Sequence, residues 1–191
     1  MRQEIFVFSA FAALAWAAPA AAQTVECSRV EASGERTLCH EVVLPASAAE
    51  VWALWATTDG LASWVAPVAA IEPAPGGMFE SSYDRNARIG DAGNIRNRVV
   101  AIVPQRLLVI QIAAAPPGFP HVEDARELTT LIELEPLGAR ETRVRVSMLG
   151  YREGAGFDAL YAFFARGNDF TLQQLRRRVT QGPTDWAAAA H

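Results

Sequence analysis

The side chains best suited to metal binding are few and far apart in this sequence. Of the three histidines, His40 lies in a strand-like segment and His191 ends the chain, whereas His121 lies in a loop with Glu123, Asp124 and Glu127 close by. An imidazole with two carboxylates is a ligand set that zinc and related metals accept. However, no second histidine lies within the usual ligand spacing, and an acidic surface loop explains the same residues. We therefore predict no metal site.

Nucleophilic and acid–base chemistry has equally weak support. The sequence has no G-x-S-x-G elbow, in which a serine is activated at a sharp turn. Glu80, Asp84 and His121 are candidates for a general acid or base. Each of them is also typical of a solvated strand end, which is the commoner place for such residues. No catalytic residue is assigned, and no cofactor is predicted.

A binding cavity has better support. Cavities for small molecules are mostly apolar, with a few placed polar groups. Tyr83, Asn97 and Thr130 lie within strand-like segments and are suitable polar groups. Ordinary core packing is the alternative for the aromatic residues. The predicted cavity residues are Trp55, Trp64, Phe79, Tyr83, Asn97, Thr130, Phe164 and Asn168, with Phe119 and Phe163 as further candidates for the wall.

The most informative of these residues is Asn168, in the last long helical segment, which is predicted over residues 157–179. The apolar stripe of this helix is interrupted at its middle by Gly167 and Asn168. Glycine costs a helix about 1 kcal/mol relative to alanine, and a buried amide needs hydrogen-bond partners. We hypothesise that this segment roofs a ligand cavity, with Asn168 as its polar contact and Gly167 allowing a close approach or a bend. A slightly rotated helix, with Asn168 in solvent, is the alternative.

The elements that must position these residues follow from hydrophobic periodicity. Alternating segments separated by Pro and Gly indicate hairpins of an antiparallel sheet. One dry face of that sheet has to be covered, and only the last helix is long enough to cover it. The predicted class is α+β, a curved antiparallel sheet wrapped around a long C-terminal helix. The predicted strands cover residues 38–44, 78–84, 95–103, 106–112, 127–135 and 142–150, and residues 115–126 are expected to form a long loop.

Two local signals are more specific. Ser47 and Glu50 form a capping-box pattern, which predicts a helix from Ala48. Cys27 and Cys39 flank a three-residue turn ending in Gly34. In a hairpin closed by that turn, paired residue numbers sum to 66, which places the two cysteines opposite each other. A disulfide is therefore predicted, with two free thiols as the alternative.

The ends of the chain differ from its middle. Residues 1–22 combine an apolar run with an A-x-A pattern and are predicted to be a secretory signal peptide, an uncleaved anchor being the alternative. A periplasmic or secreted protein is therefore expected, with no stable membrane span after cleavage. Residues 23–180 suit one domain, and residues 181–191 are expected to form a loose tail. With a net charge of −4 and no basic block, nucleic acid is not an expected partner.

Ordered segments of the chain resemble the SRPBCC (START-like) superfamily. The nearest branch is the bacterial one that resembles the C-terminal domain of the activator of the ninety-kilodalton heat-shock ATPase. The final-helix pattern of that branch, G-W-x-x-x-L-x-x-L, corresponds to residues 167–175, where Asn168 replaces the Trp. The remaining matching segments are residues 42–52, 58–61, 64–67, 75–79, 93–108, 129–136 and 141–146.

The resemblance implies a helix-grip fold with an apolar cavity between the sheet and the last helix. It also implies a small apolar molecule or a lipid as the partner, most simply bound without catalysis. An enzyme with cyclase- or hydratase-like acid–base chemistry, and a protein-interaction module, are the alternatives. No catalytic set is common to the branch. The cysteine hairpin and the predicted signal peptide depart from the family pattern.

Overall fold

A computed structural model describes residues 23–188 of the chain; the predicted signal peptide and the last three residues lie outside this part. Thirteen elements follow one another along it. The helices are α1 (Ala48–Ala56), α2 (Thr58–Ala62), α3 (Val122–Glu127) and α4 (Ala155–Gln181). The strands are β1 (Val25–Glu26), β2 (Arg29–Val30), β3 (Arg36–Leu44), β4 (Val68–Ile71), β5 (Met78–Ser82), β6 (Ile95–Val103), β7 (Leu107–Ala114), β8 (Thr129–Gly138) and β9 (Glu141–Tyr151).

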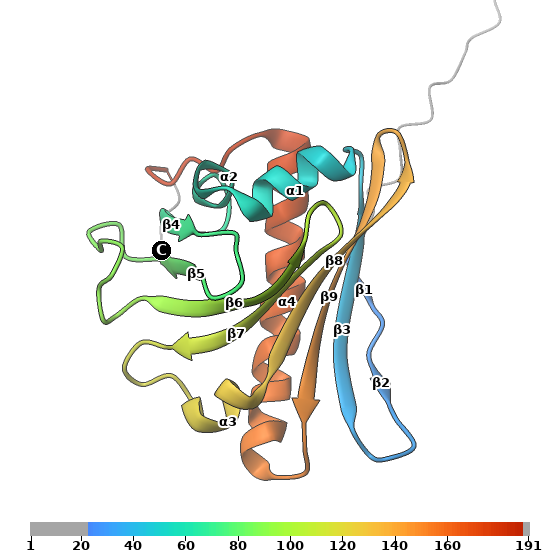
Figure 1. Cartoon of the computed structure of the whole chain (residues 1–191), viewed down its shortest axis with the longest axis vertical. Helices are drawn as coiled ribbons and strands as arrows, with labels where there is room; N and C mark the ends of the chain where they lie inside the picture. Colours follow the sequence, from blue (N-terminus) through green and yellow to red (C-terminus); the bar gives the residue numbers. More distant parts are fainter. Residues whose placement is uncertain (1–22, 189–191) are drawn as a thin grey trace, which may run out of the picture.

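The strands form a single curved antiparallel sheet in the order β1-β3-β9-β8-β7-β6-β5-β4, with β2 paired to β3. Each pair of neighbouring strands in the sheet is antiparallel. The long helix α4 runs along one face of this sheet, and α1 and α2 lie near its C-terminal half (Figure 1). The predicted α+β helix-grip class is confirmed.

Side-chain alternation separates the two faces of the sheet. On β9, Val144, Val146 and Met148 are buried toward α4. Arg145 and Arg143 point to the outer face, where the first pairs with Glu41 of β3 at 2.9 Å. Since neighbouring side chains of a strand point to opposite faces, one register fixes both the dry face and the charged face.

The N-terminal hairpin has the predicted register and disulfide. Arg29 pairs with Thr37 and Glu26 with His40, so the paired numbers sum to 66. Cys27 and Cys39 are disulfide-bonded, with their α-carbons 4.8 Å apart. Gly34 closes the turn at φ = 85°, a left-handed conformation that glycine adopts without strain.

Helix α1 begins where the capping box predicts. Ser47 accepts a hydrogen bond from the backbone N–H of Glu50, and the Glu50 carboxylate accepts one from the backbone N–H of Ser47. Two N–H groups that the helix leaves unpaired are thereby satisfied. The helix packs Val51, Leu54 and Trp55 into the core.

Three segments differ from the sequence prediction. Strand β4 was not predicted, the predicted loop at residues 115–126 contains most of α3, and residues 182–188 are docked rather than loose. In this docked segment the Thr184 N–H donates to Ser63 O (2.9 Å) and Trp186 Nε1 donates to Ala62 O (2.7 Å). Hydrogen bonds to α2 therefore hold the end of the described chain in place. None of the described helices is both long enough and apolar enough to cross a membrane.

The core consists of two apolar clusters along α4. Leu172 and Leu175 belong to the cluster that includes α1, α2 and the middle strands. Leu160 and Phe157 belong to a second cluster with α3 and the end of β9. Gly167 and Asn168 lie in the sequence between these two pairs of residues, so the apolar packing along the helix is interrupted at that point.

Candidate functional site

A cavity of about 300 Å³ lies between α4 and the inner face of the sheet. This is the lower end of the range of about 300–1,000 Å³ typical of small-molecule sites. Alternate residues of strands β5 to β9 reach it, such as Phe79 and Ser81 of β5, and Tyr83 lines it just after that strand. The remaining lining residues are Trp55, Val65, Ile95, Asn97, Ile110, Ile112, Phe119, Thr130, Ile132, Val146, Met148, Phe163, Phe164, Gly167, Asn168, Phe170 and Thr171.

Two of the lining residues hold buried nitrogens without a partner in the described chain. Asn168 is 9% exposed and Trp55 is 3% exposed. Neither Asn168 Nδ2 nor Trp55 Nε1 is hydrogen-bonded. Buried polar groups in folded proteins are rarely left unsatisfied, and those that are often mark a site for water or a ligand. Both residues line the same cavity.

Gly167 has a different role from the one that its sequence context suggested. A β-carbon built at this position has no other atom within 4 Å. The glycine therefore does not allow a close approach of helix and sheet, and the expectation of such an approach was wrong. Because Gly167 lines the cavity, its missing side chain leaves space there.

Exposed aromatic side chains border the cavity. Tyr83, Phe163 and Phe170 line it and are substantially exposed. Phe119 packs edge-on against Phe163, with ring centroids 5.6 Å apart. Partial desolvation raises the pKa of Tyr83 above its ordinary value, at which the phenol is already neutral at physiological pH.

The structure brings together seven of the eight residues predicted for the cavity. Trp64 is the exception: it is 1% exposed and lies behind Trp55, at 4.7 Å between ring centroids. Its Nε1 donates to Leu54 O (3.1 Å), which ties α1 to the segment after α2. Trp64 is therefore a core residue: it does not line the cavity, and its indole N–H already has a hydrogen-bond acceptor.

Several lining residues were not named as site residues from the sequence. Ile132, Val146 and Met148 belong to alternating strand faces that were predicted correctly. The alternation showed that these side chains were dry, but not which of them border empty space. Phe170 and Thr171 carry no such signal, because they flank the apolar stripe of α4.

The acid–base candidates lie elsewhere. Glu80 is buried, and its Oε1 accepts hydrogen bonds from the Gly90 N–H and from Asn94 Nδ2, both at 2.6 Å. Glu80 therefore holds the loop between β5 and β6. His121 Nδ1 lies 4.0 Å from Asp124 Oδ2 at the start of α3. Among the described residues no cluster of His, Cys, Asp and Glu could hold a metal ion.

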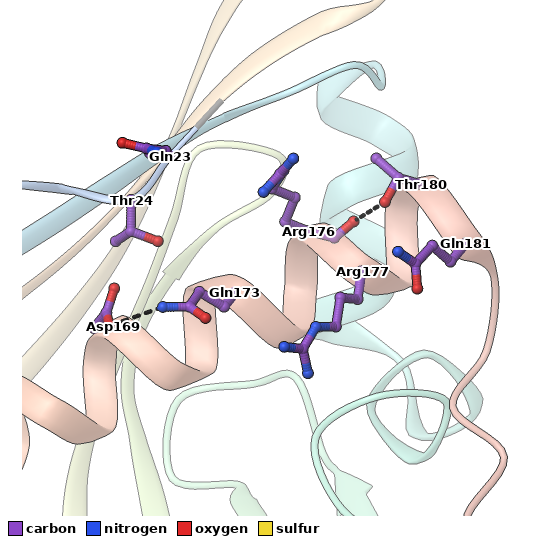
Figure 2. A pocket seen from close by; sticks show the side chains of 8 residues that line it. All are labelled: Gln23, Thr24, Asp169, Gln173, Arg176, Arg177, Thr180 and Gln181. Carbon is purple, nitrogen blue, oxygen red and sulfur yellow. Dashed lines mark hydrogen bonds between the residues drawn. The ribbon is translucent and has the colours of Figure 1, made fainter. Parts of the chain in front are cut away.

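A second hollow, of about 440 Å³, lies between α4 and the first described residues, Gln23 and Thr24 (Figure 2). Its lining is polar, and some of these side chains are already paired. Gln173 Nε2 donates to Asp169 Oδ2 at 2.8 Å, for example. None of the buried unpartnered atoms of residues 23–188 belongs to this hollow. The apolar cavity is therefore the better candidate site.

A curved antiparallel sheet, a long helix along one of its faces and an apolar cavity between them define the helix-grip class of the SRPBCC superfamily. Within that class, the family of activator of Hsp90 ATPase homolog 1-like proteins matches residues 45–180. This chain belongs to that family, as its sequence resemblance predicted. No curated protein shows a significant match to the sequence of this chain.

Solved structures share the fold at low sequence identity. The Aha1 dimer from Colwellia psychrerythraea is 20% identical, with a TM-score of 0.58 over 76% of this chain and 97% of that one. CalU16 from Micromonospora echinospora is 16% identical, with a TM-score of 0.57 over 87% and 88%. A norcoclaurine synthase mutant from Thalictrum flavum, solved with a transition-state analogue, is 10% identical, with a TM-score of 0.52 over 82% and 97%.

Proposed function

We propose that the protein is an exported binder of a small hydrophobic molecule, which it holds between α4 and the sheet without catalysing a reaction. The observation that carries this proposal is the apolar cavity with two unpartnered nitrogens at Trp55 and Asn168. A cavity filled by side chains would have no room for a ligand. Membership of a family with a ligand-binding fold supports the same role.

The lining chemistry favours binding over catalysis. Among the described residues that line the cavity, none is Asp, Glu, His, Lys, Arg or Cys. General acid–base catalysis mostly uses these side chains, and a serine or threonine nucleophile needs one of them beside it as a base. The export part of the proposal rests on the signal-like sequence of residues 1–22 and on the disulfide between Cys27 and Cys39.

Fluorescence titration with 1-aminoanthracene, a small neutral probe that brightens in apolar surroundings, tests the binding role. Gly167→Phe fills the space beside the helix, and we expect it to weaken probe binding at least tenfold. Ala162→Phe places the same side chain on an exposed part of α4 outside the cavity, and it should bind like the wild type. Equal affinities for both variants would contradict the proposed site.

An enzyme is the second candidate, because a norcoclaurine synthase solved with a transition-state analogue has the same fold. Tyr83 is the one ionisable side chain among the lining residues described. Its phenol is neutral at physiological pH, and desolvation raises its pKa further, so it would serve as an acid rather than as a base. Turnover of a bound compound that Tyr83→Phe abolishes, with 1-aminoanthracene affinity unchanged, would favour this candidate. Turnover unaffected by the substitution would count against Tyr83 as its acid.

A further inference from the structure

We propose that the cavity selects an uncharged ligand that carries a hydrogen-bond acceptor, such as a ketone oxygen, which accepts the N–H of Trp55. This inference rests on the proposed binding function and specifies the class of ligand. It follows from three features of the lining: a donor on α1, an amide on α4, and the absence of charged side chains among the described lining residues.

The donor is the more decisive feature. An indole nitrogen can donate a hydrogen bond but cannot accept one. Trp55 Nε1 is buried and unpartnered, whereas the indole N–H groups of Trp64 and Trp186 donate to backbone carbonyls. Trp55 thus has an unsatisfied donor and lines the cavity. A ligand oxygen would satisfy this donor, whereas a hydrocarbon of the same shape would leave it without a partner.

Asn168 adds a second polar contact from another element. Its amide carries both a donor and an acceptor, and the two ends of the group can exchange places by rotation. It therefore accommodates a ligand oxygen, or a hydroxyl beside that oxygen. Because Trp55 is on α1 and Asn168 is on α4, their two polar groups fix the ligand from two independent elements.

The absence of charge on the lining sets the other limit. An ionised carboxylate or amine moved from water into an apolar site needs a charged or strongly hydrogen-bonding partner. No described lining residue carries a formal charge to supply one. The cavity therefore disfavours ionised fatty acids and protonated alkylamines, and favours neutral molecules of about the size of a substituted naphthalene.

Three probes with the same ring system test this inference by isothermal titration calorimetry: 2-acetylnaphthalene, 2-ethylnaphthalene and 2-naphthoate. We expect the ketone to bind about 2- to 10-fold more tightly than the hydrocarbon, which is the contribution of one hydrogen bond. The carboxylate should bind most weakly. A carboxylate that binds as tightly as the ketone would overturn the predicted charge selection.

Two variants test whether the preference for the ketone depends on Trp55. Trp55→Phe keeps an aromatic ring and removes the N–H, so the ketone should lose its advantage while the hydrocarbon binds as before. Trp186→Phe removes an indole N–H outside the cavity and should keep the wild-type preference. If Trp55→Phe does not fold, the indole N–H resonance of Trp55 in the wild type serves instead. That resonance should move downfield with the ketone and not with the hydrocarbon.

The outcomes separate this inference from the proposed function. If ketone and hydrocarbon bind equally, a trapped water satisfies Trp55, so the inference is wrong while the binding function stands. If neither compound binds the wild type, the proposed function fails together with the inference. If the ketone is preferred and Trp55→Phe keeps the preference, the acceptor contacts another group, and the assignment to Trp55 is overturned.

Discussion

At the scale of single residues, Gly167 leaves free volume in the cavity and lowers the stability of α4. Glycine in a helix lowers stability relative to alanine, yet no atom near this position would clash with a side chain. A residue that weakens α4 without allowing closer packing is most simply explained by the volume that it leaves free. Gly167 therefore contributes to ligand binding and lowers the stability of the helix.

Gly167→Ala should therefore stabilise the fold by about 1 kcal/mol, as the difference in helix propensity requires. Urea unfolding followed by circular dichroism measures the change. Gly150→Ala is the matched control: Gly150 has φ = 98°, and a β-carbon there would lie 2.9 Å from Glu127 O, so the same substitution should destabilise the protein. Destabilisation by Gly167→Ala would show that helix packing, and not free volume, requires the glycine.

The position of Asn168 could be predicted from the sequence, whereas the role of Trp64 could not. The apolar stripe of α4 gives the direction in which position 168 faces, and the structure buries it on that stripe. Trp64 has the same aromatic character as Trp55 but donates its N–H to Leu54 O. Periodicity reveals which face of an element is apolar. It does not reveal which buried polar atoms have partners, because these come from other elements.

At the scale of elements, the capping box at the start of α1 gives a direct test. Ser47→Ala removes the side-chain acceptor for the Glu50 N–H and should destabilise the protein by about 1 kcal/mol. Chemical unfolding measures the loss. Ser33→Ala, in the exposed hairpin turn, is the control and should change stability by less. A neutral Ser47→Ala would mean that α1 is held by core packing alone.

The same box predicts a dependence on pH. Hydrogen bonds from the Ser47 side chain and backbone lower the pKa of Glu50. A lowered pKa in the folded state means that the contribution of this carboxylate is complete above its unfolded pKa and is lost as the pH falls through the folded value. The stability difference between the wild type and Glu50→Gln should therefore shrink as the pH falls below the ordinary range of a glutamate. A difference that stays constant would show that the charge of Glu50 does not matter.

The disulfided hairpin is an element whose removal should leave the site intact. Replacing both Cys27 and Cys39 with alanine opens a link across 12 positions, which should cost about 2–3 kcal/mol. Denaturant unfolding under non-reducing conditions measures the effect. Neither cysteine lines the cavity, so the affinity for 1-aminoanthracene should not change. Reduced affinity in the double variant would show that the hairpin supports the binding site.

Elements with strong local signals were predicted, and elements fixed by packing were missed. The cysteine hairpin and α1 have a turn glycine and a capping box, respectively. Helix α3 has no side-chain cap: His121, in a left-handed conformation at φ = 48°, precedes it. The four-residue strand β4 acquires its structure by pairing with β5. Such contacts join residues that are not recognisable as partners in the sequence alone.

At the scale of the whole molecule, the cavity lies where the packing along α4 changes from one cluster to the other. The cluster around Leu172 and Leu175 includes α1 and α2, and the docked segment after α4 adds hydrogen bonds from Thr184 and Trp186. The cluster around Leu160 holds the opposite end of the helix. Because both ends of α4 are anchored, the helix can span a cavity at its middle without collapsing onto the sheet.

The most direct test of the binding function is a native mass spectrum of the gently purified protein. We predict a non-covalent adduct of a small organic molecule in the wild type and in Ala162→Phe, which is released on collisional activation. Gly167→Phe, in which the new side chain fills the cavity, should be detected without the adduct. An adduct of equal abundance in Gly167→Phe, or none in any of the three proteins even after incubation with 2-acetylnaphthalene, would contradict the proposed binding function.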